Sequence, residues 1–449
     1  MEEHRDHTST ILCDRVEGLR PAQGSVNTLQ GRPRRFFGWW ITAAAFVTSG
    51  LAVGVPYYNI GFFYDYFQRA FGWSRAEITL GFPLAALLTL WAGPLFIHRF
   101  SARMLIVAGS GLTAIALAAF GKMGSILWIY YAIWVVYTAG YIFSGPIPHQ
   151  LIVSYWFRKN RGKAMGAVYV GNGLLGSVGS LLVKPLTERF GFQAALMILA
   201  ALVLLCWPIA ILILRDKPAD LGQFPDGDRE APAEAALESH SFAELLGSYS
   251  FWLLLAGSFC SIGAVGAINF HMKFVFLDAG FATGPAVDAV WRTASVLILW
   301  SSVAGRLLIG GLADRLSKKV VMTGTFALIA ATIPILLLVR PGQETALYSF
   351  AVLFGFGLGA DYMLIPLMAA EQFGVNSLGR AMAVILPVNT IGQTWLPYVV
   401  SILRDRFGSY SIAMGAVLAI ALGGAISIAI LPKGSAGQMI WQRKISASS

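Results

Sequence analysis

Residues 320–339 read VVMTGTFALIAATIPILLLV, a run of 20 residues without a charged side chain, and Lys319 and Arg340 flank it. A membrane-spanning helix needs about 20 consecutive apolar residues. The stretch therefore predicts a helix that crosses a lipid bilayer. Over the whole chain of 449 residues, 56% are hydrophobic and 12% are charged, whereas a soluble domain carries about 25% charged residues. This composition excludes an ordinary soluble globule.

Similar apolar runs recur along the chain and predict an all-α membrane protein with twelve transmembrane helices. Some runs are longer than a bilayer requires, so we expect these helices to tilt or to extend beyond it. The predicted spans are 38–62, 76–97, 102–121, 126–154, 163–187, 192–214, 250–277, 288–312, 319–339, 345–369, 380–403 and 410–431.

Polar segments divide the apolar runs into domains. Residues 1–35 lack an apolar stretch of signal-peptide length and are predicted to form a disordered cytosolic tail. Residues 215–248, rich in Pro, Asp, Glu and Ala, are predicted to form a cytosolic linker between two six-helix bundles, 36–214 and 249–432. Residues 433–449 are predicted to be a second cytosolic tail.

The distribution of basic residues predicts the orientation of the chain. The formal net charge is +10, but the basic residues lie in loops between apolar runs, so a nucleic-acid partner is not expected. With the N-terminus inside, the segments predicted to be cytosolic hold 22 Lys and Arg residues, against 10 on the opposite side. Since cytosolic loops are enriched in Lys and Arg, we expect a multi-pass protein of the inner or plasma membrane with both termini in the cytoplasm.

The two predicted bundles resemble each other at a fixed offset. Gly162–Met165 reads GKAM and Gly379–Met382 reads GRAM, 217 residues later, and at the same offset Asn172 falls on Asn389. Six-helix repeats of this kind are one recurrent transporter plan, with the solute site between the halves near the middle of the membrane. The repeat predicts two pseudo-symmetric bundles enclosing a polar path.

One loop carries a specific motif. Residues 310–319 read GGLADRLSKK, which resembles the G-x-L-x-D-R-x-G-R/K-R/K loop of the major facilitator superfamily, with Ser317 where glycine is usual. The corresponding loop of the first half, 94–103, has His98 in place of the aspartate. The resemblance implies the major facilitator fold and a conformational latch on the cytosolic side. The residues that it assigns to this latch are Asp314, Arg315, Lys319, Arg99 and Arg103.

Within that superfamily the chain is similar to the monocarboxylate and oxalate:formate antiporter branch. The similarity rests on Gly38–Trp40 at the start of the first span, on the loop 156–164 and on Arg306, which precedes Gly310 by four residues. It implies that Arg306 binds a substrate carboxylate. The chain departs from the animal carriers at Ser302, where they have aspartate, and at Tyr57, where they have lysine; the lysine that the oxalate carriers have in span 11 has no counterpart.

Ionisable residues within spans are functional candidates because an ionised group inside a bilayer costs a few kcal/mol. The planar guanidinium of Arg306 suits a carboxylate, although the residue could instead snorkel to the interface. Asp361 stands in an apolar, glycine-rich span and could take up a proton, or it could form a fixed ion pair, with Arg306 among the candidates. His271 could contribute to proton coupling or be a hydrogen-bonded structural residue.

Polar and aromatic residues near the middle of spans could line the solute path. Asparagines at repeat-related positions could equally be interhelical hydrogen-bond partners, and any single aromatic could serve in packing. The residues assigned to substrate binding beside Arg306 are Tyr57, Asn172, Asn389, Tyr362 and Gln393.

Motifs of other function classes are absent from the sequence. It contains no P-loop, no H-E-x-x-H and no G-x-S-x-G, and Cys13, Cys206 and Cys260 have no metal-ligand spacing, so neither an enzyme nor a cofactor is expected. We predict a secondary active transporter of a small organic anion, a monocarboxylate or similar carboxylate, coupled to protons and working by alternating access. It would be a uniporter, symporter or antiporter that can work as a monomer. The alternatives are an efflux pump for amphipathic compounds and a non-transporting membrane receptor.

Overall fold

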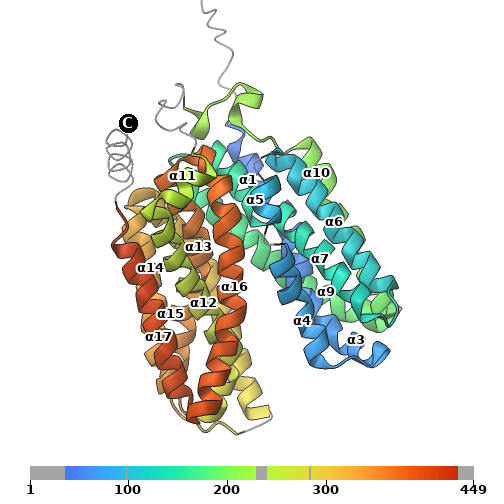
Figure 1. The fold of residues 1–449 in the computed structure, drawn as a ribbon, viewed down its shortest axis with the longest axis vertical. Coiled ribbons are helices and arrows are strands. Elements are labelled where there is room, and N and C mark those ends of the chain that lie inside the picture. The colour runs from blue at the N-terminus through green and yellow to red at the C-terminus, as the bar shows by residue number, and fades with distance from the viewer. Residues whose placement is uncertain (1–35, 90, 98, 229–239, 283–284, 433–449) are drawn as a thin grey trace, which may run out of the picture. The chain divides into compact units, whose positions relative to one another are not determined.

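The computed structural model describes residues 36–89, 91–97, 99–228, 240–282 and 285–432. Within these ranges every regular element is a helix (Figure 1), so the all-α prediction is confirmed. The predicted tails, 1–35 and 433–449, lie outside the described residues, as do His98 and residues 229–239 of the predicted linker.

The helices that precede the linker are mostly interrupted or bent. The first segment passes through α1 (Gly38–Ser49), the π-helical turn η1 (Gly50–Gly54), α2 (Val55–Asn59), the 3₁₀ turn η2 (Ile60–Phe63) and α3 (Tyr64–Phe71). It is followed by α4 (Arg75–Leu88), α5 (Ala92–Phe96), α6 (Ala102–Lys122), α7 (Leu127–Ser144), α8 (Pro146–Trp156), α9 (Arg161–Leu204) and α10 (Cys206–Leu212).

The π-helical turn in the first segment has a local cause. Pro56 has no N–H, and its ring would clash with the carbonyl four residues earlier in a regular helix. A π-turn relieves this conflict. Gly50 lies in the same turn and packs against α9, where an added Cβ would stand 2.8 Å from the carbonyl oxygen of Gly171. The turn therefore brings the segment that carries Tyr57 close to α9.

The long helix α9 contains a reversal at Gly191. This residue has φ +81° and ψ 160°, a backbone conformation that residues other than glycine rarely adopt. The continuous assignment Arg161–Leu204 thus holds two helices, which correspond to the predicted spans 163–187 and 192–214.

After the linker the helices are long and regular. Two short 3₁₀ turns, η3 (Pro218–Leu221) and η4 (Pro225–Gly227), and the helix α11 (Phe242–Gly247) belong to the linker. The remaining helices are α12 (Tyr249–Asp278), α13 (Pro285–Arg315), α14 (Lys318–Leu338), α15 (Glu344–Phe373), α16 (Val375–Phe407) and α17 (Tyr410–Ala429).

Nine helical segments of the described chain are long and apolar enough to cross a membrane. One of them, 161–212, contains the reversal at Gly191 and so supplies two of the predicted spans. Two further predicted spans correspond to α4 with α5 and to α16, which do not meet the same criterion. The prediction of one continuous helix over 76–97 is corrected: this span consists of two helices, because α4 ends at Leu88 and α5 begins at Ala92.

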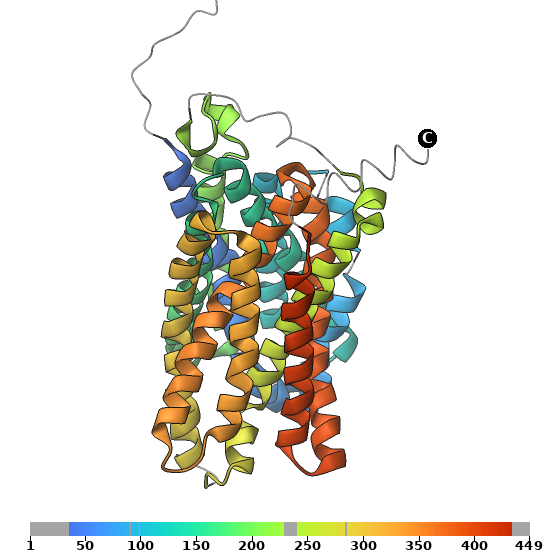
Figure 2. The ribbon, with the colours of Figure 1, turned by 90° about the vertical axis from the view of Figure 1, so that its left-hand side faces the viewer.

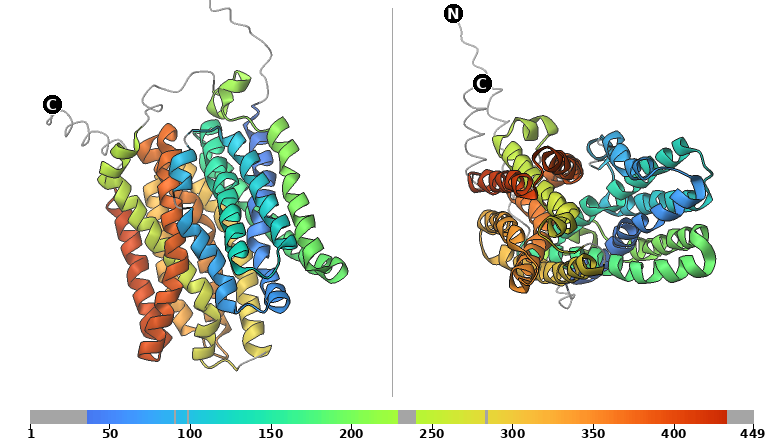
Figure 3. Two further views of the ribbon diagram at one scale, coloured as in Figure 1. Left: turned by 45° about the vertical axis from the view of Figure 1, so that its right-hand side comes forward. Right: turned by 90° about the horizontal axis from the view of Figure 1, so that it is seen from below.

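The helices before and after the linker form two groups, which lie on opposite sides of the view in Figure 1 and separate again when seen from below in Figure 3. Figure 2 shows the second group side-on, with α12 to α17 running along its length. Large apolar side chains point outward from both groups; Trp128 of α7 is 77% exposed and Trp300 of α13 is 66% exposed. A surface of this kind requires lipid as its solvent, in agreement with a multi-pass membrane protein.

The two groups touch at the end where the linker attaches. The carboxylate of Asp314, at the end of α13, accepts hydrogen bonds from the backbone N–H groups of Gly162 (2.6 Å) and Lys163 (2.9 Å) at the start of α9. Gly310 of α13 also faces the backbone of Gly162, where an added Cβ would stand 2.6 Å from its carbonyl oxygen. These contacts close the space between α9 and α13 at the linker end.

The linker is held to both groups of helices. Asp226 of η4 accepts hydrogen bonds from the backbone N–H groups of Arg158 (2.7 Å) and Lys159 (2.6 Å), in the loop before α9. On the other side Arg380 of α16 donates from Nη1 to the carbonyl oxygen of His240 at 2.8 Å. The described parts of the linker are therefore anchored to the helices that they connect.

Candidate functional site

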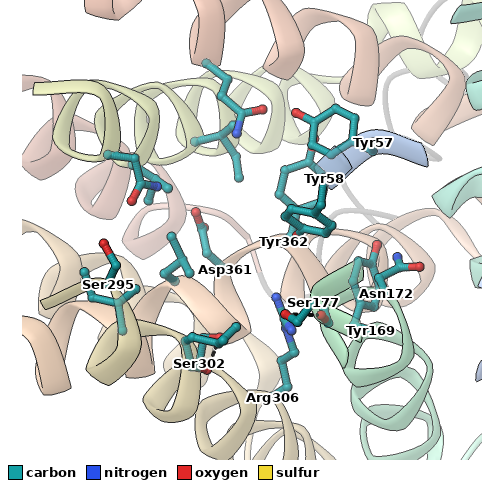
Figure 4. A pocket seen from close by; sticks show the side chains of 18 of the residues that line it. Tyr57, Tyr58, Tyr169, Asn172, Ser177, Ser295, Ser302, Arg306, Asp361 and Tyr362 are labelled. Atoms are coloured by element: carbon teal, nitrogen blue, oxygen red, sulfur yellow. Dashed lines mark hydrogen bonds between the residues drawn. The ribbon is translucent and has the colours of Figure 1, made fainter. Parts of the chain in front are cut away.

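A cavity of about 570 Å³ lies between the two groups of helices (Figure 4). One wall comes from η1, α2, α7, α8 and α9, and the other from α12, α13, α15 and α16. Its size falls within the range of pockets that bind small molecules, about 300–1,000 Å³. Because both groups contribute to its walls, a ligand bound here would contact both.

Arg306 of α13 lines the cavity and packs directly against α9. An added Cβ at Gly173 would stand 2.7 Å from Nη1 of Arg306, so the guanidinium rests against this glycine. Among the described residues neither Nε nor Nη1 has a hydrogen-bond partner, and no carboxylate lies within ion-pair distance of the side chain. An unpartnered guanidinium inside a membrane protein is costly, so it favours an anionic ligand.

Asp361 of α15 lies on the same cavity and is 1% exposed. Its Oδ1 accepts a hydrogen bond from the hydroxyl of Ser261 on α12 at 3.1 Å, while Oδ2 has no partner among the described residues. The sequence allowed a fixed ion pair between Asp361 and Arg306. In the described part of the chain no guanidinium nitrogen of Arg306 lies within 4.0 Å of the carboxylate oxygens of Asp361, so this pair is not formed. Each side chain thus keeps buried polar atoms that have no partner within the described residues.

Four of the other predicted binding residues line the cavity: Tyr57, Asn172, Tyr362 and Gln393. Asn172 accepts a hydrogen bond at Oδ1 from the hydroxyl of Ser49 at 2.6 Å, which fixes its orientation on α9. In Figure 4 the side chain of Arg306 points toward the side of the cavity where Tyr57 and Tyr362 lie. The structure thus brings these residues together in one cavity with Arg306.

Two predicted residues lie elsewhere. Asn389 is fully buried and accepts a hydrogen bond at Oδ1 from Ser258 at 3.1 Å, so it joins α16 to α12 rather than facing the cavity. His271 is buried between helices, with Nδ1 3.0 Å from the hydroxyl of Tyr410 and Nε2 2.8 Å from the carbonyl oxygen of Pro397. Both therefore match the structural alternative, an interhelical hydrogen bond.

Sequence reasoning also missed residues of the cavity. Tyr141 and Tyr169 contribute aromatic rings, and Ser177 and Ser295 contribute hydroxyls. The hydroxyl of Tyr169 accepts a hydrogen bond from Nε2 of Gln150, which holds the ring in place. No signal in the sequence distinguishes these residues from the many other tyrosines and serines of the spans.

The five predicted latch residues differ in their contacts and in their exposure. Asp314 makes the contacts with α9 described above, whereas Arg315 and Arg99 are exposed, Lys319 is half-buried, and the backbone N–H of Arg103 donates to Asp216 at 2.8 Å. The sequence did not single out the ion pair between Lys318 and Glu371, whose atoms lie 2.8 Å apart and join α14 to α15. Only Asp314 among these five bridges the two groups through a hydrogen bond that the structure records in the described residues.

The chain matches the family model of the Major Facilitator Superfamily over residues 42–397. It is 24% identical to monocarboxylate transporter 11 of Mus musculus, with 90% of this chain and 89% of that protein covered. It is 26% identical to the MFS transporter asaE of Aspergillus flavus, with 83% and 81% covered. The solved structure of the E. coli fucose:proton symporter FucP superposes with a TM-score of 0.66 at 14% identity, covering 89% of this chain and 100% of that one.

Proposed function

We propose that this chain, which belongs to the major facilitator superfamily of secondary transporters, carries a small organic anion with a single carboxylate and couples its movement to protons. The observation that supports this most directly is the unpartnered guanidinium of Arg306 in a cavity between the two groups of helices. The similarity to proteins named monocarboxylate transporters adds support.

In this proposal Arg306 binds the carboxylate. Guanidinium offers two pairs of parallel N–H donors, Nη1 with Nη2 and Nε with Nη2, and either pair matches the two oxygens of a carboxylate. Nε and Nη1 of Arg306 are buried without a protein partner within the described residues. Tyr57, Tyr362 and Gln393 surround the same space and would contact the rest of the solute. Asn389 and His271 have no part in this proposal.

Asp361 is the proposed proton carrier. Its Oδ2 lies free of hydrogen bonds in the described structure, within the cavity that holds Arg306. When ionised, the carboxylate would attract the guanidinium and compete with the solute; when protonated, it would leave Arg306 to the solute anion. Proton binding and solute binding would therefore favour each other, which is the requirement for symport.

Alternating access would arise from motion of the two groups about the cavity. The contacts of Asp314 with α9 close the linker end in this structure and would have to break for the solute to leave there. We propose that this end faces the cytoplasm of a cell membrane, with both termini on the same side, because the positively charged loops lie there.

The proposal is tested by uptake of labelled monocarboxylates into proteoliposomes under an imposed pH gradient, with empty liposomes as the blank. Arg306→Ala should lower kcat/KM about 100-fold or more, because two charge-assisted hydrogen bonds contribute roughly 3 kcal/mol. Arg306→Lys should recover only part of the activity, since it restores the charge without the planar fork. Arg340→Ala, an exposed arginine outside the cavity, is the matched control and should transport normally. Normal uptake by Arg306→Ala would remove this residue from the mechanism.

The efflux alternative would use the same aromatic walls without needing a particular charge. An efflux pump would move many unrelated amphipathic compounds, and Arg306→Ala would leave that movement intact. A panel of cationic and neutral dyes, measured in the same vesicles, separates the two functions.

A further inference from the structure

Aromatic side chains form part of the wall of the cavity that contains Arg306. Five tyrosines line it, and they are joined by a tryptophan from α13. These residues are Tyr57, Tyr58, Tyr141, Tyr169, Tyr362 and Trp291. They come from α2, α7, α9, α13 and α15, so the aromatic surface is assembled from both groups of helices.

The tyrosines present both faces and edges of their rings. Tyr57 packs against Tyr58 with ring centres 5.6 Å apart and planes at 86°, and against Tyr141 at 5.5 Å and 31°. Aromatic rings prefer offset or edge-to-face contacts at centre distances of about 4.5–7 Å. A further ring entering this cavity could extend the same packing.

The hydroxyl groups of this wall favour a ring over an alkyl chain. In the described structure Tyr57, Tyr58 and Tyr141 make no hydrogen bond through their hydroxyls, whereas Tyr169 is bonded to Gln150. Covering such hydroxyls with an aliphatic chain would bury polar groups without partners. A ring that carries a polar substituent would satisfy them while still packing on the aromatic faces.

The charges of the cavity limit the solute to one carboxylate. Arg306 is the single cation among the lining residues, all of which belong to the described chain, and the other lining group that can be charged is the carboxyl of Asp361. A second carboxylate on the solute would find no cation and would lie near an acidic side chain. The size of the cavity, about 570 Å³, exceeds what an acid of two to four carbons needs to fill it.

We infer that the solute is an aromatic monocarboxylate whose carboxylate binds Arg306 and whose ring packs on Tyr57, Tyr58 and Tyr141. This inference rests on the proposed function, because it takes Arg306 as the carboxylate site. It adds that the aromatic wall, rather than the charge alone, selects the solute.

Binding to the full chain in lipid nanodiscs, measured by isothermal titration calorimetry with empty nanodiscs as the blank, tests the inference. The probes are 3-(4-hydroxyphenyl)propionate, propionate and octanoate, which share one carboxylate and differ in the ring and the length of the body. We expect the aromatic acid to bind at least tenfold more tightly than either of the other two. Equal or tighter binding of octanoate would show that apolar size alone decides and would overturn the inference.

Variants distinguish a failure of this inference from a failure of the proposed function on which it rests. Tyr57→Leu and Tyr141→Leu should each weaken binding of the aromatic acid roughly tenfold more than they weaken binding of propionate, as expected for the loss of one ring contact. Tyr348→Leu, an exposed tyrosine outside the cavity, should change neither. If propionate binds as well as the aromatic acid and both need Arg306, the proposed function stands and the inference fails. If Arg306→Ala binds all three acids normally, the proposed function fails as well.

Discussion

Replacing Asp314 by alanine should open the linker end of the protein. The carboxylate of this residue accepts hydrogen bonds from the backbone N–H groups of Gly162 (2.6 Å) and Lys163 (2.9 Å), in the first turn of α9. A hydrogen bond to a charged acceptor contributes about 1.5–3 kcal/mol, and a carboxylate at the positive end of a helix gains roughly 0.3–1 kcal/mol more. Asp314 is half-buried, so water would replace part of both contributions.

We take a net loss of about 2 kcal/mol, which corresponds to a roughly 30-fold change in the ratio of closed to open states. Asp314→Asn should cost less free energy than Asp314→Ala, because the amide oxygen still accepts one of the two hydrogen bonds. The second is lost, since the amide NH₂ group is a donor and faces an N–H. The effect falls on the conformational equilibrium, and the fold should remain intact, since the lost contacts join two groups of helices and leave each core unchanged.

The equilibrium can be followed by double electron–electron resonance between spin labels at Phe100→Cys and Leu316→Cys, both exposed positions at the linker end. Asp314→Ala should add a longer distance to the distribution. Asp405→Ala is the matched control. This carboxylate is exposed, and its ion pair with Arg404, at 3.9 Å on the surface, contributes little to stability. A distance distribution unchanged by Asp314→Ala would refute the reasoning that this carboxylate joins the two groups.

Three further predictions concern the cavity and the fold. Gly173→Ala places a methyl group 2.7 Å from Nη1 of Arg306 and should raise the KM for the solute about tenfold in the uptake assay, whereas Gly324→Ala, with nothing within 4 Å, should be neutral. Gly191→Ala meets no neighbouring atom but forces a side chain into φ +81°, so it should cost about 1–3 kcal/mol and lower the Tm in a thermal unfolding assay. Asp361→Asn should abolish proton-driven accumulation while leaving solute exchange across the membrane measurable; retained accumulation would exclude this residue as the proton carrier.

The spans could be predicted from the sequence because lipid leaves the backbone few options. Each N–H and C=O group inside a bilayer must be satisfied within the protein, so a long apolar run becomes a helix. The interruptions are harder to place. Pro56 follows a π-turn within one helical segment, whereas Pro146, preceded by Gly145, marks the break between α7 and α8. Proline thus has different structural effects in different packing environments.

The cavity could be predicted only in part, because hydropathy does not fix the rotation of each helix. It also does not fix how far along one helix face the cavity extends: Tyr137 and Tyr141 stand one turn apart on the same face of α7, yet Tyr137 is buried in the core and Tyr141 lines the cavity. Asn172 and Asn389 occupy equivalent positions in the repeat, but only Asn172 reaches the cavity. Local differences in neighbouring helices, such as the hydroxyl of Ser258 beside Asn389, decide which residue is satisfied internally.

Arg306 connects binding with closure through its position on α13. The residue faces α9 twice: an added Cβ at Gly166 would meet its carbonyl oxygen, and one at Gly173 would meet its guanidinium. Any movement of α13 along α9 must therefore displace the group proposed to hold the solute. A solute anion that neutralises the guanidinium also removes the cost of enclosing an unpaired charge between the helices. The proposed anion site and the contact between α9 and α13 thus lie on one helix pair, so solute binding would bias the motion without a separate relay.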